Sequence, residues 1–399
     1  MSLNLTFFNT LESVYKARDF SFLTLAFSIF LLPLSVNLSS IALVTSLTIK
    51  FVQVIFFKHQ WYAQKSLKYS SLIGFVFVLY IFFNAILQTN FTYVITVFEK
   101  EFSHFGLLFL APMLLRNRVE NKLLIDTLAL GLITAVLFVF FKSYVLDINF
   151  DKVAFIKILD IHHTYLSIFI LFFVNILLIS IPNKEASDYK TTLIIIIGIL
   201  LVAFLMLFIL GSKVSMVVYL LFILGYVFMY FFRNRSIKIL VILPVLIICF
   251  FVFNKKIDTT YKSALNFRVE IWQESINSIQ EKPFFGNLQM IERDLLNLNH
   301  YKSGKYYLMD SDLNSHNQFL SILLKFGFVG AAILILLIVN LFIFKNKDLP
   351  KKTLQNGIGF FVILFFTFYI ENVLDRHHGI VFFSLFFNYY LVSISNEKS

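Results

Sequence analysis

Residues 191–210 have the sequence TTLIIIIGILLVAFLMLFIL. The stretch holds 20 residues and no charged side chain. An α-helix rises about 1.5 Å per residue, so about 20 apolar residues cross the roughly 30 Å hydrocarbon core of a bilayer. The stretch therefore predicts a transmembrane helix.

The apolar character extends over the whole chain. Of its 399 residues, 59% are hydrophobic and 14% are charged, and 52 Phe are spread along its length. A soluble domain carries about 25% charged and about 45–50% apolar residues. Together with the mean hydropathy of +0.81, this composition excludes a soluble enzyme with one anchor, a fibrous protein and a disordered chain.

Comparable apolar runs divide the chain into about twelve predicted membrane spans. They cover residues 20–35, 38–57, 70–88, 103–115, 123–141, 163–181, 191–210, 214–232, 237–253, 316–344, 357–373 and 379–395. The fourth run is short for a full crossing, so we expect it to be tilted or partly re-entrant. The predicted fold class is all-α: a polytopic membrane helix bundle with a long, partly helical extracytoplasmic loop between the ninth and tenth spans.

Basic residues set the predicted orientation of the bundle. They gather in alternate short loops, for example at 58–68, 116–122 and 345–352, while the loops between them hold few. Because cytoplasmic loops carry the excess of basic residues, we expect both termini to be cytoplasmic. The same distribution accounts for the net charge of +11, so we do not infer nucleic-acid binding. We expect the first span to be retained, since no small-residue cleavage site closes it.

Residues 254–315 form one long connection, which this orientation places outside the cytoplasm. An amphipathic helix is predicted within it, because apolar residues recur at helical spacing, at Leu265, Val269, Trp272, Ile276 and Ile279. A break at Pro283 and Gly286 precedes a second helical pattern. The predicted division is an N-terminal membrane region of nine spans (1–253), this loop (254–315) and a C-terminal membrane region of three spans (316–399).

Two basic residues are candidate phosphate ligands near the outer membrane surface. Arg268 lies beside the apolar stripe of the predicted loop helix, where its planar guanidinium can bind a phosphate through two hydrogen bonds. Lys213 follows Gly211 and Ser212 in a tight outer turn and offers a compact cation. The alternatives are a snorkelling Arg268, whose stem covers apolar surface, and ordinary interfacial anchoring by Lys213.

His316 and Asn317 begin the tenth predicted span on its outer side. With Asn314 or Ser315 as the helix cap, both fall in the first turn, where the positive end of the helix dipole disfavours a protonated imidazole. A neutral His316 can accept the proton of a hydroxyl and so act as a general base. The alternative is a capping or interfacial histidine.

Charged and imidazole side chains also collect at the outer end of the eleventh predicted span, at Glu371, Asp375, Arg376, His377 and His378. Ionisable groups so near the hydrocarbon core are costly and often functional. Arg376 can equally be the structural partner of a neighbouring carboxylate, and the sequence leaves both interpretations open.

Other motifs favour neither a metal nor a nucleotide. Asp160, His162 and His163 lack a spacing that defines a metal site, and the acidic residues of 310–312 fit a solvated turn better. The single cysteine, Cys249, excludes a disulfide framework and a cysteine-based metal site. No Walker-type glycine-rich loop occurs, which argues against an ATP-driven pump.

Taken in order, these motifs resemble the signature of the O-antigen ligase and polymerase family. The signature residues are Arg268, Trp272, Pro283, Phe284, Gly286, His316, Asn317, Gln318, Phe319, Leu320, Gly327 and Gly330. A later set is similar to the junction of the last two spans in Bacteroidetes-type members: Glu371, Leu374, Arg376, Gly379, Phe382 and Phe383. The twelve predicted spans and the long loop after the ninth are also similar to the family's ligases.

The resemblance implies an enzyme that moves a glycan from undecaprenyl diphosphate to a sugar hydroxyl on lipid A-core or another surface acceptor, without metal, nucleotide or other cofactor. It implies that His316 activates the acceptor hydroxyl, that Arg268 holds the donor diphosphate, and that attack inverts the anomeric carbon. Lys213 stands where the family usually has arginine, which keeps the charge but loses the planar fork. Arg376 and Asn317 complete the candidate substrate-binding set. The implied location is the bacterial inner membrane, among membrane lipids, with the site on the periplasmic side.

Two other functions stay open. A polymerase of the same family uses the same donor chemistry, and the sequence does not separate it from a ligase. A non-catalytic lipid-oligosaccharide flippase would show charged residues in the middle of its spans or repeated halves. In this chain the middle of most spans is apolar, and the unusual polar groups gather on one side.

Overall fold

A computed structural model describes residues 2–16, 18–88, 91–181, 189–231, 259–310, 312–345 and 349–395. Over these residues the chain forms α-helices, one 3-10 turn and no β-strand. The predicted all-α class is confirmed. The predicted boundary between 253 and 254 lies outside the described residues, so the division into three regions stays a prediction.

The helices follow one another with short connections. Their bounds are α1 (Ser2–Lys16), α2 (Phe20–Leu31), α3 (Val36–Phe57), α4 (Lys65–Gln88), α5 (Phe91–Leu114), α6 (Arg118–Val145), α7 (Lys152–Leu159), α8 (His163–Ser180), α9 (Tyr189–Ile209), α10 (Lys213–Phe231), α12 (Thr259–Glu281), α13 (Glu292–Lys302), α14 (Tyr306–Met309), α15 (Gln318–Ile343), α16 (Lys351–Ile370), the 3-10 turn η1 (Val373–Asp375) and α17 (His377–Ile394).

The apolar runs coincide with these helices. Among the described residues, eight helices are long and apolar enough to cross a membrane, and shorter apolar helical segments cover Phe20–Leu31, Phe105–Leu114 and Lys213–Tyr226. Together they account for eleven predicted runs; the ninth, 237–253, lies outside the described residues. The chain is therefore a polytopic membrane helical protein.

The fourth predicted run, 103–115, is the second half of a longer helix. Helix α5 has 24 residues and begins at Phe91. The charged residues Glu99, Lys100 and Glu101 end the apolar pattern in the sequence, although the helix continues through them. The apolar run therefore predicted an element that was too short.

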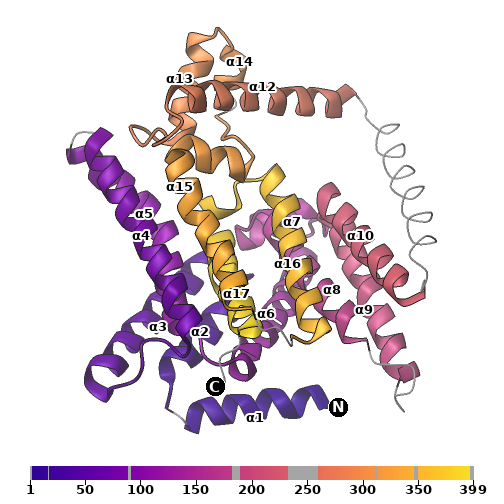
Figure 1. Cartoon of the computed structure of the whole chain (residues 1–399). Helices are drawn as coiled ribbons and strands as arrows, with labels where there is room; N and C mark the ends of the chain where they lie inside the picture. The colour runs from indigo at the N-terminus through magenta and orange to yellow at the C-terminus, as the bar shows by residue number, and fades with distance from the viewer. Residues whose placement is uncertain are drawn as a thin grey trace.

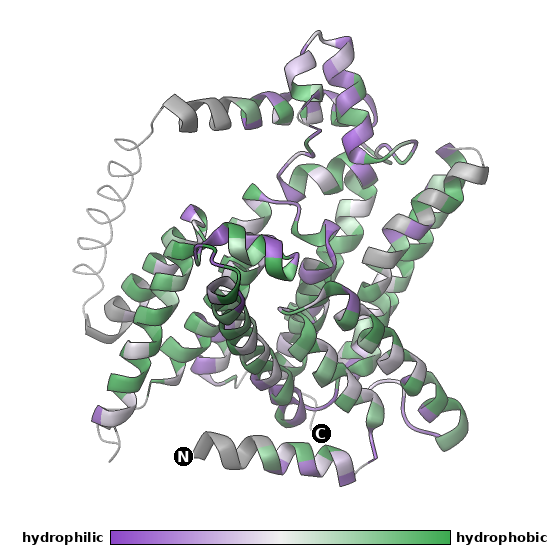
Figure 2. Ribbon diagram, turned by 180° about the vertical axis from the view of Figure 1, so that it is seen from behind, coloured by the Kyte–Doolittle hydropathy of each residue, from purple (hydrophilic) through white to green (hydrophobic). Residues whose placement is uncertain are grey.

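Helices α12, α13 and α14 lie across one end of the bundle (Figure 1). Both ends of the chain and helix α1 lie at the opposite end (Figure 1). Hydrophilic residues concentrate in α13, α14 and the nearby loops, whereas the long helices are mostly hydrophobic (Figure 2). We call α12–α14 the cap of the bundle. It corresponds to the partly helical loop that the sequence predicted.

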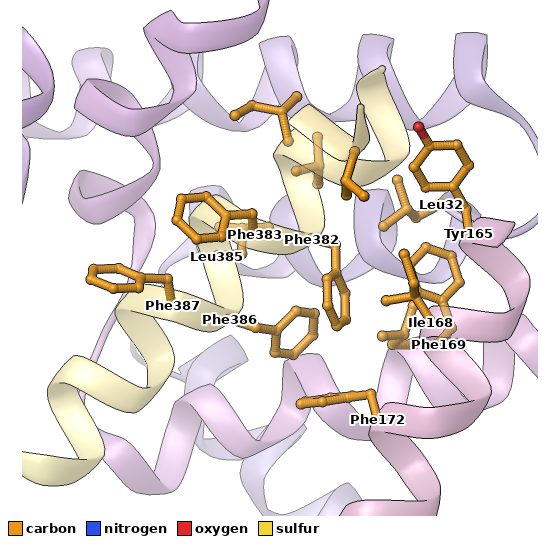
Figure 3. Close-up of a cluster of buried hydrophobic side chains, with 14 of the residues drawn as sticks. Leu32, Tyr165, Ile168, Phe169, Phe172, Phe382, Phe383, Leu385, Phe386 and Phe387 are labelled. Atoms are coloured by element: carbon orange, nitrogen blue, oxygen red, sulfur yellow. The ribbon is translucent and has the colours of Figure 1, made fainter. Parts of the chain in front are cut away.

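Helix α17 lies at the centre of the bundle and is buried over most of its length. Its Phe382 and Phe386 pack against Phe169 and Phe172 of α8 (Figure 3). The ring centroids of Phe172 and Phe386 are 4.7 Å apart. Aromatic pairs of this kind contribute about 0.5–1.5 kcal/mol beyond the area that they bury. Ring packing of this kind holds the N-terminal end of α17 in place, which is the end that borders the candidate site.

The turn that begins at Pro283 is fastened to a kink in α15. The amides of Asn287, Phe328 and Val329 donate to the carbonyls of Leu324 (2.8 Å), Pro283 (2.8 Å) and Phe284 (3.1 Å). The kink is at Gly327, whose φ is 62° and ψ −168°. Gly286 has φ 69° and lies against the backbone of α15 at this kink. A Cβ at Gly286 would be 2.5 Å from the carbonyl of Lys325. Only glycine fits where the two backbones approach so closely. The turn at 283–287 and the kink at Gly327 therefore form one rigid joint.

Helix α4 also supports this joint. Tyr80 Oη donates to the carbonyl of Phe326 (2.6 Å), and Asn84 Nδ2 donates to that of Phe285 (2.6 Å). On the cap side, a small apolar core joins α12, α13 and α14 to α15: Ile271, Ile279, Leu296, Leu308 and Leu324. The cap is therefore fixed to α15, whose N-terminal end carries the candidate site.

Candidate active site

A cavity of about 300 Å³ lies between the cap and the N-terminal ends of α15 and α17. Side chains from five parts of the fold surround it: α5, α13, the segment before α15, α15 itself and the segment between α16 and α17. The lining residues are Glu101, Ile291, Glu292, Arg293, Asp312, Leu313, Asn314, His316, Lys325, Glu371, Asn372, Asp375 and Arg376. The cavity is thus rich in ionisable groups, as enzyme sites commonly are.

His316 lies two residues before the start of helix α15, not in its first turn as predicted. The helix cap is Asn317, whose side-chain oxygen accepts from the amides of Phe319 (3.0 Å) and Leu320 (3.2 Å). The predicted capping by Asn314 or Ser315 is therefore wrong. His316 has φ 46°, in the left-handed region that non-glycine residues seldom adopt. The buried Asn317 uses its side-chain carbonyl to cap the N-terminus of α15. Its role in substrate binding stays a prediction.

Glu371 is the acidic neighbour of His316. His316 Nδ1 lies 3.3 Å from Glu371 Oε1, and both side chains are partly buried. Burial raises the pKa of Glu371, but His316, His162 and Arg376 lower it more, so its pKa lies below the ordinary value. Glu371 is therefore a carboxylate at neutral pH. A carboxylate beside one imidazole nitrogen orients the ring and favours the protonated form that appears after proton transfer.

Glu292 of α13 joins the cap to the segment around His316. Its carboxylate accepts from the Ser315 amide (2.9 Å), from Asn372 Nδ2 (3.0 Å) and from Ser321 Oγ. On the other face of this segment, Trp272 Nε1 donates to the Ser315 carbonyl (2.9 Å). Helices α12 and α13 therefore both bind the backbone next to His316.

Lys325 is a buried cation that the sequence analysis overlooked. It is 4% exposed, and its Nζ lies 2.7 Å from Asp375 Oδ1 and 3.4 Å from Glu101 Oε2. The same ammonium lies 5.4 Å from the ring centroids of both Phe105 and Phe326. The signal was present in the sequence, because a lysine inside an apolar run is costly in a membrane and needs a partner.

Arg376 lines the cavity with an exposed side chain. The predicted structural pairing with Glu371 or Asp375 does not form, because these carboxylates lie instead against His316 and Lys325. Arg376 makes no ion pair with any part of the chain that the structure describes. Its guanidinium is therefore available to an anionic ligand in the cavity.

Arg268 and Lys213 do not line the cavity. Arg268 lies on α12, one turn before Trp272, and is half-buried. Lys213 is the exposed first residue of α10, next to Gly211, whose φ of 63° makes the tight turn. Of the predicted site residues, the structure brings His316 and Arg376 together around one cavity. Asn317 lies beneath them as the helix cap.

His162 lies close enough to Glu371 for the two groups to affect each other. Burial lowers the pKa of His162, the charge of Glu371 opposes this, and the cations Arg376 and Lys152 add to the lowering. Its ring centroid is 4.2 Å from that of His163. Within the described residues, no three His, Cys, Asp or Glu side chains are arranged to hold a metal ion.

Asp312, one of the two acidic residues in the predicted solvated turn, is exposed and paired with Arg293 at 3.1 Å. It also accepts from Asn297 Nδ2 at 2.7 Å. The turn is thus tied to α13 at the edge of the cavity.

Comparison with protein families identifies a match over part of the chain. Residues 198–335 match the family model described as O-antigen ligase. The matched region runs from α9 to α15 and contains Lys213, Arg268, His316 and Lys325. No curated protein matches the chain. Over residues 198–335, about a third of its length, the chain is thus similar to the O-antigen ligase family.

Proposed function

We propose that this protein transfers a glycan from undecaprenyl diphosphate to a sugar hydroxyl on lipid A-core or another surface acceptor. The family assignment supports a membrane enzyme of glycan ligation or polymerisation. The observation that carries the proposal further is the pair of His316 and Glu371 at the edge of a cavity that Arg376 also lines. A base and a cation beside one cavity are the groups that this reaction requires.

In the proposed reaction, the neutral imidazole of His316 takes the proton of the acceptor hydroxyl. The hydroxyl oxygen then bonds to the anomeric carbon of the donor from the face opposite the diphosphate, and the bond from that carbon to the phosphate oxygen breaks. The electron pair leaves with undecaprenyl diphosphate, and the configuration inverts. Glu371 stabilises the imidazolium until its proton passes to solvent.

Fixed cations supply the charge that the departing diphosphate needs, so we propose a metal-independent reaction. Arg376 lines the cavity directly. Arg268 and Lys213 lie outside its lining, so we assign them to the part of the diphosphate that remains outside the cavity, towards the lipid. Fixed charges of this kind are commonly a large part of catalysis. Transfer activity that persists in EDTA would agree with this assignment.

We further propose that the cavity faces the periplasm and that both termini are cytoplasmic, in the bacterial inner membrane. The cap, which borders the cavity, and the two chain ends lie at opposite ends of the bundle (Figure 1). The distribution of basic residues favours the cytoplasm for the chain ends.

The test is transfer by the purified protein from a lipid diphosphate glycan to a defined sugar acceptor. We expect His316→Ala to lower the turnover rate by about 10²–10⁴-fold, which is the usual contribution of a positioned base. His59→Ala, in the loop after α3 and away from the cavity lining, is the matched control and should transfer at the wild-type rate. Equal rates for both variants would reject the general-base role.

A polymerase of the same family is the second candidate, because it uses the same donor chemistry as a ligase. Deletion of the gene, followed by gel analysis of surface glycans, separates the two. Loss of all attached glycan with retained lipid-linked polymer identifies a ligase, whereas a single attached repeat identifies a polymerase. A flippase is disfavoured because the ionisable groups surround a cavity at one end of the bundle.

A further inference from the structure

Asn372 lies between α16 and α17 and is 1% exposed. Its side-chain amide makes four hydrogen bonds. Oδ1 accepts from the amide of Asn317 (2.8 Å) and from Ser315 Oγ (3.2 Å). Nδ2 donates to Glu292 Oε1 (3.0 Å) and to Asp375 Oδ2 (3.2 Å). The hydrogen-bonding capacity of the amide is thus directed entirely at the residues that surround the candidate base.

The two groups that donate to Asn372 lie on either side of His316. Ser315 and Asn317 are its chain neighbours, and Ser315 is also held by Glu292. His316 itself has φ 46°, a conformation that persists only where its surroundings impose it. The contacts on both flanks supply that constraint.

Asn372 also determines the position of the acidic partner. It directly follows Glu371 in the chain, so the bonds that fix Asn372 restrict the backbone of Glu371. On its far side, Asp375 is held by the buried ammonium of Lys325 at 2.7 Å. One amide therefore connects the segment of His316 with the segment of Glu371.

We propose that Asn372 is a positioning residue that sets the distance between His316 and Glu371. The inference rests on the proposed function, in which His316 is the base. Without the amide, the segments 315–317 and 371–375 lose their direct link. A displacement of about 1 Å at a reacting group can lower a rate by about 10²-fold.

The first experiment compares Asn372→Ala with wild type in the transfer assay. We expect the turnover rate to fall by about 10–10²-fold, while the KM for the lipid diphosphate donor changes by less than about twofold, because the proposed donor cations are unchanged. Asn340→Ala is the matched control. Asn340 is 2% exposed and so is buried like Asn372. Among the described residues, its side-chain amide bonds only to the Ser66 carbonyl (3.4 Å).

A double-mutant cycle tests whether Asn372 acts through Glu371. We expect Asn372→Ala to add less than about twofold to the loss already caused by Glu371→Gln, because the distance that Asn372 sets no longer matters. Losses that multiply would show an independent, purely structural effect and would overturn the proposal. If Asn372→Ala does not accumulate, Asn372→Gln keeps the amide but displaces it by one methylene, and it is judged by the same criterion.

His316→Ala, assayed in parallel, distinguishes a failure of the proposed function from a failure of the positioning role of Asn372. A wild-type rate in His316→Ala removes the proposed function, and the positioning role falls with it. An inactive His316→Ala beside a fully active Asn372→Ala overturns the positioning role alone and leaves the base assignment intact.

Discussion

Lys325 Nζ lies 2.7 Å from Asp375 Oδ1, and this pair of a buried lysine and a partly buried aspartate joins α15 to the segment between α16 and α17. A second carboxylate, Glu101 of α5, lies 3.4 Å from the same ammonium. Three distant parts of the chain therefore meet at one cation. Because a buried charge without its partner is strongly unfavourable, the arrangement should be sensitive to removal of the lysine.

Lys325→Met is expected to destabilise the fold by about 3–5 kcal/mol, since Asp375 loses its buried counter-charge. Thermal unfolding of the purified protein in detergent measures the change. Lys302→Met, which alters an exposed lysine at the end of α13, should stay within about 0.5 kcal/mol of wild type. Equal unfolding temperatures for Lys325→Met and Lys302→Met would contradict the structural role of the pair.

Gly286→Ala is expected to destabilise the protein more than Gly304→Ala. Both glycines have positive φ, 69° and 72°, so both substitutions incur roughly 1–2 kcal/mol of backbone strain. Only at Gly286 does the added Cβ also meet the backbone at the α15 kink, whereas nothing lies within 4 Å at Gly304. Unfolding temperatures of the two variants isolate the cost of this contact, and similar values would show that the joint is looser than described.

The sequence was sufficient to predict the helices because a membrane permits few alternatives. Backbone groups inside a bilayer must satisfy their own hydrogen bonds, so a long apolar run such as 191–210 has to be helical. His316 and Arg376 were also predictable as candidates, because a polar group at the end of an apolar run is conspicuous. Their common cavity confirms that these two lie together.

The interactions between segments were not predictable in the same way. Lys325 stands out as a charge inside the apolar run 316–344, but the sequence does not show which residues are its partners. One of them, Glu101, lies where α5 seemed to be interrupted. The pairing of His316 with Glu371 depends on how α15 and α16 pack. Helical periodicity in either segment carries no information about the other, so only the fold reveals these pairs.

Stability should respond to pH through Glu371. Its pKa is lowered by His316 and other cationic groups beyond what burial adds, so the carboxylate stabilises the fold above the ordinary pKa of 4.5. That contribution is lost as pH falls through the lower folded value. The gap in unfolding temperature between wild type and Glu371→Gln should therefore shrink as the pH falls below about 4.5. A gap that widens under acid would contradict the assignment.

Membrane topology can be tested with reporter fusions. A reporter placed near Asn299 in α13 should be extracytoplasmic, and one placed near Lys347, after α15, should be cytoplasmic, because α15 is long and apolar enough to separate them. Fusions that both report the same side would remove the basis for placing the cavity in the periplasm.

The variant Arg268→Lys tests whether Arg268 is a phosphate ligand or a side chain that only covers apolar surface. Its guanidinium can bind a phosphate through two parallel hydrogen bonds, which the ammonium of lysine cannot reproduce. Lysine does keep the charge and the aliphatic stem, so Arg268→Lys should unfold at the wild-type temperature whichever role is correct. If Arg268 holds the donor, we expect the KM for the lipid diphosphate to rise by about tenfold, the cost of about one charge-assisted hydrogen bond. Arg118→Lys, on the first turn of α6, is the matched control and should bind donor as wild type does. Unchanged donor affinity in Arg268→Lys would leave packing by its stem as the role of this residue on α12.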